Sequence, residues 1–378
     1  MPLITPNLVS IRNVSIKALV LLILLNLIFV LARPVPTLGR FSLYNSLFPG
    51  RQRLPYGDNP ERAYNLSLYN LEAMFASHEL ADGVKPPDEF RVILIGDSST
   101  WGFLLPTEHT LSAQLNSAEL ELPDGRHLRA YNLGYPVMSL TKDLMILSYA
   151  MRYQPDLIVW LFTLESFPKD KQLFPPLLQN NAETVRELIK KYDLDLNPDD
   201  PDLFDHQLID LSIPGQRRSL ADLIRLQLYG ILWAATGIDQ DIPDTYSPRM
   251  ENLPAEDGFQ NLSPPYLREN DLAMDVLYAG IEASENVPII FVNEPMFISE
   301  GENSDIRYNF YYPRWAYDQY RQIIAHHCKV NNWYCLDMWD SISPDEFTNS
   351  AVHLSVRGSA QLAKYLQEVI KQVASNSN

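Results

Sequence analysis

The chain has 378 residues, of which 46% are hydrophobic, and it carries a formal net charge of −17 at pH 7. This length and composition allow a sizeable buried core, either in two average domains or in one large domain with insertions. The acidic balance argues against a nucleic-acid partner, because a surface that binds phosphates needs clustered Lys and Arg.

The first predicted element is an apolar segment near the N-terminus. Hydrophobic residues occupy positions 18–32 and are interrupted only by Asn26. This run is longer than many signal-peptide cores, and no small-x-small cleavage site follows it. We therefore expect an uncleaved transmembrane anchor over 18–33, after an N-terminal tail of the cytoplasmic type over 1–17. A cleaved signal peptide and a buried core helix are the alternatives.

The charges around this anchor do not decide its orientation. Basic residues lie on both sides of the apolar segment, so the positive-inside rule gives no answer. We place the body outside the cytoplasm because the segment has the position of a secretion signal.

A connector with a helical stretch is expected over 34–85, followed by one α/β domain over 86–378. Short, continuously apolar runs in this domain are typical of strands that are covered on both faces. They occupy residues 90–96, 128–134, 156–162, 287–293 and 333–338. Helical patterns alternate with them, which predicts a three-layer α/β/α, flavodoxin-like parallel sheet.

One interval breaks this alternation. Residues 166–286 contain no clear strand, but they include helical patterns at 182–192 and 218–237. We interpret the interval as a helical insertion that caps the carboxyl edge of the sheet, where such folds place their sites. It is either a substrate lid, with residues 226–233 resting on a membrane, or a structural subdomain.

Two sequence blocks at opposite ends of the domain suggest a catalytic pair. The stretch ILIGDSSTWG, residues 93–102, runs from a predicted strand through Gly96 and Asp97 to Ser98. It resembles the first block of the SGNH/GDSL hydrolases, a family of serine esterases. The stretch SAVHLSVRGSAQLAKYL, residues 350–366, resembles the last block of that family. The resemblance implies the SGNH fold, Ser98 as the nucleophile and His353 as the general base.

The oxyanion-binding residues match the family less well. The stretch AYNLGYPVMSLTKDL, residues 130–144, is similar to the second block, in which a late glycine N–H holds the oxyanion. Val137 stands at that position, and Gly134 matches an earlier glycine. A backbone donor does not require glycine, so we expect the N–H groups of Ser98 and Val137 to serve, with Gly134 as the alternative.

The third block departs from the family at the position of an asparagine donor. Glu165 stands where the family has that asparagine, at the end of the strand in QPDLIVWLFTLESF. An ionised carboxylate accepts hydrogen bonds and would repel an oxyanion. Glu165 is therefore protonated, has another role, or is replaced by another donor, for which Asn293 is the candidate.

The acid that normally orients the histidine is also missing. The family has Asp three residues before the histidine, where this chain has Ser350, with Asn349 beside it. A nearby acid, a backbone carbonyl or a neutral acceptor could orient the imidazole instead. The acids considered are Asp337, Asp340, Asp345 and Glu346. We regard Asp97, Glu165 and Ser350 as positions that modulate the site.

The cysteines and histidines predict no cofactor and no metal site, since two cysteines and seven scattered histidines supply no ligand framework. Cys328 and Cys335 form a local disulfide if the domain lies outside the cytoplasm, or they are two reduced thiols.

Three functions follow from the resemblance. The first is a serine esterase that forms an acyl-enzyme through Ser98 and His353. The second is an O-acyltransferase or accessory protein for the acylation of a cell-surface polysaccharide. The third is an inactive SGNH-shaped binding or scaffolding protein. The expected partners are an ester or acylated carbohydrate substrate, the membrane through the N-terminal helix, and a membrane-bound O-acyltransferase.

Overall fold

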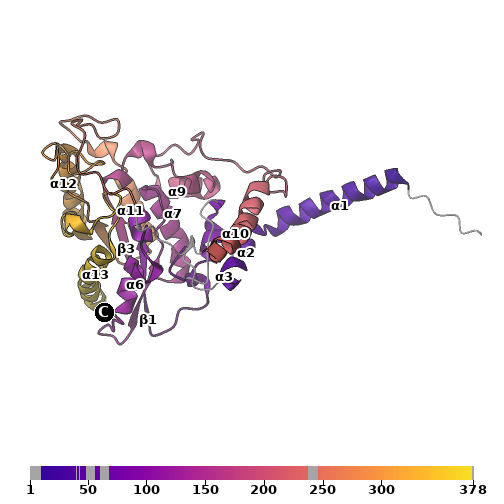
Figure 1. The fold of residues 1–378 in the computed structure, drawn as a ribbon, viewed down its shortest axis with the longest axis horizontal. Helices are drawn as coiled ribbons and strands as arrows, with labels where there is room; N and C mark the ends of the chain where they lie inside the picture. The colour runs from indigo at the N-terminus through magenta and orange to yellow at the C-terminus, as the bar shows by residue number, and fades with distance from the viewer. Residues whose placement is uncertain are drawn as a thin grey trace, which may run out of the picture.

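The computed structural model describes residues 10–39, 41, 43–47, 56–59, 68–236 and 246–376. Figure 1 shows a body of strands and helices from which the long helix α1 (Ile11–Ala32) projects. Within the described ranges, α1 is the one helix long and apolar enough to cross a bilayer. Its 22 residues correspond to about 33 Å, slightly more than the roughly 30 Å of a bilayer core.

The centre of the body is a parallel sheet of five strands in the order β2-β1-β3-β4-β5. The strands are β1 (Glu89–Ile95), β2 (His127–Asn132), β3 (Leu157–Phe162), β4 (Ile289–Asn293) and β5 (Tyr334–Asp337). All five correspond to predicted strands, so the parallel α/β prediction is confirmed. This strand order has its switch point between β1 and β3, where flavodoxin-like folds place their sites.

Helices cover both faces of the sheet. One face carries α6 (Leu111–Ser117) and α13 (Val356–Asn376), and their apolar side chains form one core cluster. The other face carries α4, α7, α8, α9, α11 and α12, which form the second cluster. Their bounds are α4 (Leu71–Ala76), α7 (Leu140–Ala150), α8 (Pro176–Gln179), α9 (Ala182–Tyr192), α11 (Met274–Ala283) and α12 (Arg314–Asn331). Both faces of the central strands are buried, which explains why their sequences are continuously apolar.

The interval 166–286 contains parts with different positions in the fold. Helices α8 and α9 pack on α7, and α11 is the regular crossover helix between β3 and β4. A Cβ on Gly280 of α11 would lie 2.3 Å from the Trp160 ring, so this helix packs tightly on the sheet. The helical insertion was expected to reach residue 286, but the chain is again part of the α/β layers from Met274, where α11 begins. Helix α10 (Arg217–Thr236) contacts α2 (Val35–Gly39) and α3 (Leu43–Leu47).

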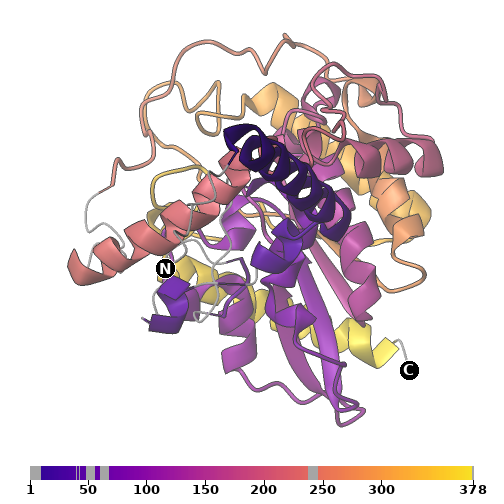
Figure 2. The same ribbon diagram turned by 90° about the vertical axis from the view of Figure 1, so that its right-hand side faces the viewer.

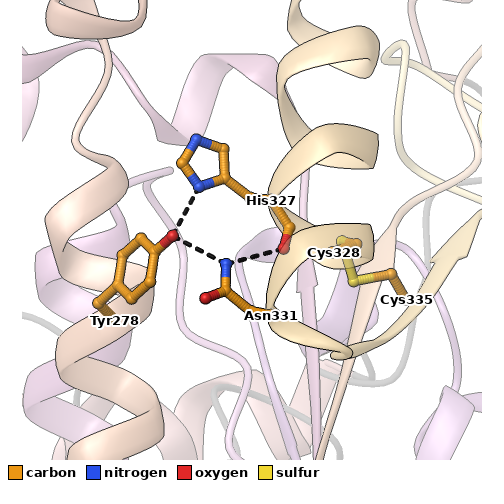
Figure 3. The surroundings of a disulfide bond; sticks show 5 residues. All are labelled: Tyr278, His327, Cys328, Asn331 and Cys335. Carbon is orange, nitrogen blue, oxygen red and sulfur yellow. Dashed lines mark hydrogen bonds between the residues drawn. A yellow bond between two sulfur atoms is a disulfide. The ribbon is translucent and has the colours of Figure 1, made fainter.

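The two cysteines form a disulfide that joins the end of α12 to β5. Figure 3 shows that Tyr278 of α11 lies beside this region. Its Oη is hydrogen-bonded to His327 Nδ1 at 2.8 Å and accepts from Asn331 Nδ2 at 2.9 Å. The disulfide and these bonds tie α11, α12 and β5 together at one side of the sheet.

Candidate active site

The nucleophile turn follows β1 directly. Asp97 caps the four-residue helix α5 (Ser98–Trp101), with Oδ1 accepting the Ser99 N–H at 2.7 Å. A Cβ on Gly96 would lie 2.2 Å from Thr100 Oγ1 and 3.0 Å from the Leu161 carbonyl oxygen. Only glycine leaves room for this close approach. The local sequence therefore places Ser98 at the first position of a short helix, at the carboxyl end of β1.

His353 lies next to this serine. The distance from Ser98 Oγ to His353 Nε2 is 2.8 Å, although the two residues are 255 positions apart in the chain. His353 comes from a small hairpin before α13, in which Phe347 pairs with Leu354 and the Thr348 N–H donates to the His353 carbonyl at 2.8 Å. The structure thus brings together the two residues that the end blocks of the sequence had pointed to.

The other imidazole nitrogen is held by a neutral amide. His353 Nδ1 lies 2.8 Å from Asn349 Oδ1, which is an acceptor, so the proton resides on Nδ1 and Nε2 is free to accept from Ser98. Ser350, at the position of the family's aspartate, is not the partner. Of the nearby acids, Asp337 bonds Asn293 and Arg321, and Glu346 bonds Ser355. Among the described residues, the hydrogen-bond partner of His353 Nδ1 is Asn349, so Asn349 orients the imidazole.

The environment of His353 favours its neutral form. Burial lowers the pKa of His353 below its ordinary value of 6.5, and the negative charge of Asp97 acts in the opposite direction. The Phe103 ring contributes to this burial, with its centroid 4.8 Å from that of the imidazole. A neutral imidazole can accept a proton, so His353 has the protonation state of a general base at neutral pH.

The backbone at Val137 has the conformation that a glycine would favour. Its φ angle is 78°, in the left-handed region, which is rare for a β-branched residue. Among the described residues, neither the Val137 N–H nor the Ser98 N–H donates a hydrogen bond to any acceptor. Both groups are therefore open to a ligand oxygen.

Gly134 has a different role in the same loop. Its N–H donates to Asn132 Oδ1 at 3.0 Å, and a Cβ at this position would lie 2.3 Å from the Trp101 nitrogen. The glycine thus allows the loop after β2 to pack against α5, and its N–H is already engaged. Val137 is the better candidate of the two for an oxyanion donor.

Glu165 connects the turn after β3 to a distant segment. Its Oε1 accepts from Lys171 Nζ at 2.8 Å, and Gln260 Nε2 donates to both carboxylate oxygens, at 2.6 and 2.7 Å. This bonding corresponds to the second of the three alternatives for Glu165, a role other than oxyanion binding.

Asn293 does not supply the missing donor. Its Nδ2 donates to Asp337 Oδ1 at 2.8 Å, and its Oδ1 accepts from the hydroxyls of Tyr317 and Tyr320, both at 3.2 Å. The side chain is buried in this network, so its N–H groups are not directed to an oxyanion at Ser98. The expectation for Asn293 is therefore corrected by the structure.

A fully buried lysine, which the sequence analysis did not identify, links the two backbone segments of the site. Lys142 Nζ donates to the carbonyl oxygens of Gly96 at 2.9 Å and Tyr135 at 2.7 Å, and it pairs with Asp143 Oδ1 at 2.8 Å. The Tyr135 N–H also donates to the Gly96 carbonyl at 3.0 Å. These bonds join the turn before Ser98 to the loop that carries Val137. The sequence signal was a Lys-Asp pair within the apolar helix LTKDLMILSYA.

Two further carboxyl groups lie buried near this lysine. Glu294, just after β4, is hydrogen-bonded to the Ser99 hydroxyl, and burial and the charge of Asp97 raise the pKa of Glu294. Burial also raises the pKa of Asp143 to about 6, even though Lys142 and Trp160 Nε1 favour its ionised form. The turn that carries Ser98 therefore packs against a buried polar cluster in which the charge of each titratable group affects its neighbours.

No family model and no curated protein matches this chain. Solved structures with a similar fold include two lipolytic proteins of the G-D-S-L family. The protein from Veillonella parvula is 11% identical, with a TM-score of 0.35, and the match covers 74% of this chain and 97% of that one. The protein from Desulfitobacterium hafniense is 12% identical, with a TM-score of 0.32 and coverages of 74% and 99%.

A third similar structure is a catalytic mutant of an acetylxylan esterase from Geobacillus stearothermophilus. It is 12% identical, with a TM-score of 0.35, and the match covers 74% of this chain and 94% of that one.

Proposed function

We propose that this chain is a serine esterase of the SGNH/GDSL type. The observation that carries the proposal is the 2.8 Å contact between Ser98 Oγ and His353 Nε2, with the second imidazole nitrogen held by Asn349. A nucleophile, a base and a group that orients the base are the parts that acyl transfer requires.

In the proposed reaction, His353 Nε2 takes the hydroxyl proton as Ser98 Oγ bonds to the ester carbonyl carbon. The carbonyl oxygen becomes an oxyanion, which accepts from the N–H groups of Ser98 and Val137. The imidazolium then gives its proton to the leaving alcohol, and an acyl-enzyme remains. Water attacks this ester with His353 again acting as base, which releases the acid and restores Ser98.

The charge on the imidazolium is stabilised in an unusual way. Asn349 is neutral, so it orients the ring but offers less stabilisation than the usual carboxylate. The nearby charge of Asp97 raises the pKa of His353 and so favours the protonated intermediate, against the effect of burial. Asp97 therefore supplies part of the electrostatic support that the orienting residue lacks.

Attachment to a membrane, with the body outside the cytoplasm, is part of the proposal. The apolar helix α1 and the Cys328–Cys335 disulfide support it, because disulfides persist mainly in oxidising compartments. In that setting a sugar hydroxyl could replace water in the second step and transfer the acyl group to a cell-surface polysaccharide. Such a transferase would work with a membrane-bound O-acyltransferase as its source of acyl groups.

The decisive experiment is labelling of the full chain with a fluorophosphonate probe, followed by mass spectrometry to locate the adduct. We expect an adduct on Ser98 that is absent in Ser98→Ala and strongly reduced in His353→Ala. Ser350→Ala is the matched control, and it should label normally because Ser350 does not hold the imidazole. A panel of acyl esters would then distinguish acetyl from longer acyl groups.

The proposal fails if the folded parent protein is labelled neither by a bulky probe nor by a small one. That result would favour the binding or scaffolding function. Thermal melting of each variant shows whether a loss of labelling reflects chemistry or unfolding.

A further inference from the structure

We propose that a group of apolar side chains around the foot of α1 inserts into the surface of a lipid bilayer and fixes the orientation of the body on the membrane. We call this group the collar and define it as Phe41, Leu47, Ile209, Ile224, Leu228 and Leu232. Each of these side chains is between 54% and 64% exposed. The proposal does not depend on the esterase activity.

Helix α10 supplies half of the collar, as an apolar stripe on its exposed side. Ile224, Leu228 and Leu232 follow one another at a spacing of four residues, so they form one stripe along the helix. Gly230 and Ala234, on another side of the helix, are buried. A surface helix normally turns its apolar stripe to the core and its polar residues outward. An apolar stripe that faces outward instead indicates that a second apolar phase contacts α10.

The position of α10 is tied to α1 by a hydrogen bond. The N–H of Ile213, in the segment before α10, donates to Asn26 Oδ1 at 3.1 Å. Asn26 is the residue that interrupts the apolar run of α1, and it lies six residues, or about 9 Å, before the end of that helix. This segment also carries Ile209, so an exposed apolar side chain lies close to the membrane-spanning helix.

The remaining members come from the chain just after α1. Phe41 lies between α2 and α3, and Leu47 ends α3. Helix α10 contacts both α2 and α3. Figures 1 and 2 show these three helices gathered where α1 meets the body. The collar therefore brings together segments that are far apart in sequence. They lie at the end of α1 where this helix, if it spans the membrane, would leave the bilayer.

The charge of α10 fits the same occupant. The helix contains Arg217, Arg218 and Arg225 but only one acid, Asp222, whereas the chain as a whole has a net charge of −17. All three arginines are exposed. Cationic residues beside an apolar stripe are typical of helices that lie in the interface of an anionic membrane.

A bilayer explains these features better than a second protein does. No residue of α1 is buried, and most of the helix is exposed, so lipid would supply most of its apolar surroundings. The bilayer that surrounds α1 would also reach the collar. Helices that lie in the membrane interface insert by about 5–10 Å, and Asn26, which contacts the segment before α10, lies at a similar distance of about 9 Å from the end of α1. Attachment at two points would restrict tilting and hold the Ser98 site at a constant height above the lipid.

The test uses the full chain in nanodiscs of phosphatidylcholine and phosphatidylglycerol, with a fluorophore on a single introduced cysteine. Leu228→Cys reports on the collar, and Val84→Cys, at a position that is 95% exposed, is the control. The native cysteines are joined in the disulfide and stay unlabelled without reductant. Nanodiscs leave both membrane faces open to aqueous iodide, so the orientation of the span does not affect the result.

We expect doxyl-labelled lipids to quench the fluorophore at 228 at least threefold more strongly than the fluorophore at 84, and iodide to show the reverse order. Equal iodide quenching at the two positions would overturn the proposal. Protection from iodide at 228 without quenching by lipid would also overturn it, because it would show that a protein covers the collar. Thermal melting compared with the parent chain verifies that both variants are folded.

Discussion

The turns after β1 and β3 lie at neighbouring positions on the carboxyl edge of the sheet, yet their polar groups are bonded in different ways. After β1, the hydroxyl of Ser98 meets His353, and the backbone N–H of Ser98 has no acceptor within the described residues. After β3, the carboxylate of Glu165 is occupied by Lys171 and Gln260. One turn presents reactive groups to a ligand, and the other connects segments of the protein.

This difference fits the proposal that the reactive groups come from a few segments of the chain. A serine hydrolase needs only a nucleophile, a held base and oriented donors, and these can come from few segments. Here they come from the β1 turn, the loop after β2 and the hairpin before α13. The turn after β3 is then free to serve a structural purpose, and Glu165 is tolerated there. Three sets of variants test this difference between the two turns.

The largest effect is expected for Lys142→Met, because Lys142 bonds the turn before Ser98 and the loop after β2. The carbonyls of Gly96 and Tyr135 would lose a donor, and Asp143 would stay buried without its partner. We expect a loss of about 3–5 kcal/mol in the free energy of unfolding, as for other broken buried ion pairs. The rate of labelling at Ser98 should fall by about a hundredfold or more.

A double variant separates these two effects. In Lys142→Met with Asp143→Asn, no unpaired charge is buried, and the amide can still accept from Trp160 Nε1. The free energy of unfolding should largely recover, while labelling stays slow because the hydrogen bonds from position 142 to the carbonyls of Gly96 and Tyr135 are still missing. Parent-like labelling of the double variant would show that Lys142 does not position the site.

An intermediate effect is expected at Asn349. Asn349→Ala removes the acceptor on His353 Nδ1, and labelling should slow by about ten- to a hundredfold, which corresponds to about 1.4–2.7 kcal/mol on the barrier. Asn349→Asp places a carboxylate at the same position, so it should label at least as fast as the parent at neutral pH. Slower labelling of the aspartate variant would contradict the role of Asn349 as a neutral substitute for an acid.

The pH dependence gives a second measurement on the same variants. In the proposed reaction neutral His353 is the base, and burial lowers its pKa below 6.5, so the labelling rate of the parent should fall only when the pH drops below that value. A carboxylate at position 349 favours the protonated ring and raises the pKa of His353. The acid limb of Asn349→Asp should therefore lie at higher pH than that of the parent.

The smallest effect is expected for Glu165→Ala, on the structural side of the comparison. Labelling of Ser98 should stay within about threefold of the parent, since the carboxylate contacts Lys171 and Gln260 and not the nucleophile. The partly exposed ion pair contributes about 1 kcal/mol or less to stability, which a thermal melt would detect. A loss of labelling of about 10²–10³-fold, typical of a lost oxyanion donor, would place Glu165 in the reaction after all.

Local sequence patterns were sufficient for the layers of the fold and for the two ends of the dyad. Continuous apolar runs are read directly as covered strands, because burial on both faces is a property of each strand by itself. Gly96 and Asp97 similarly predict the tight turn that carries Ser98, because the turn and the helix cap involve only adjacent residues.

The partners of these residues were decided only by tertiary packing. Asn349, and not its neighbour Ser350, contacts His353 because of the path of the hairpin before α13. Lys142 bonds both Gly96 and Tyr135 because α7 packs against the segments that follow β1 and β2. The second block placed Val137 at a glycine position, but its positive φ is a property of the folded loop. Hydrogen-bond partners across a fold depend on distances between segments, and these distances are set when the helices pack on the sheet.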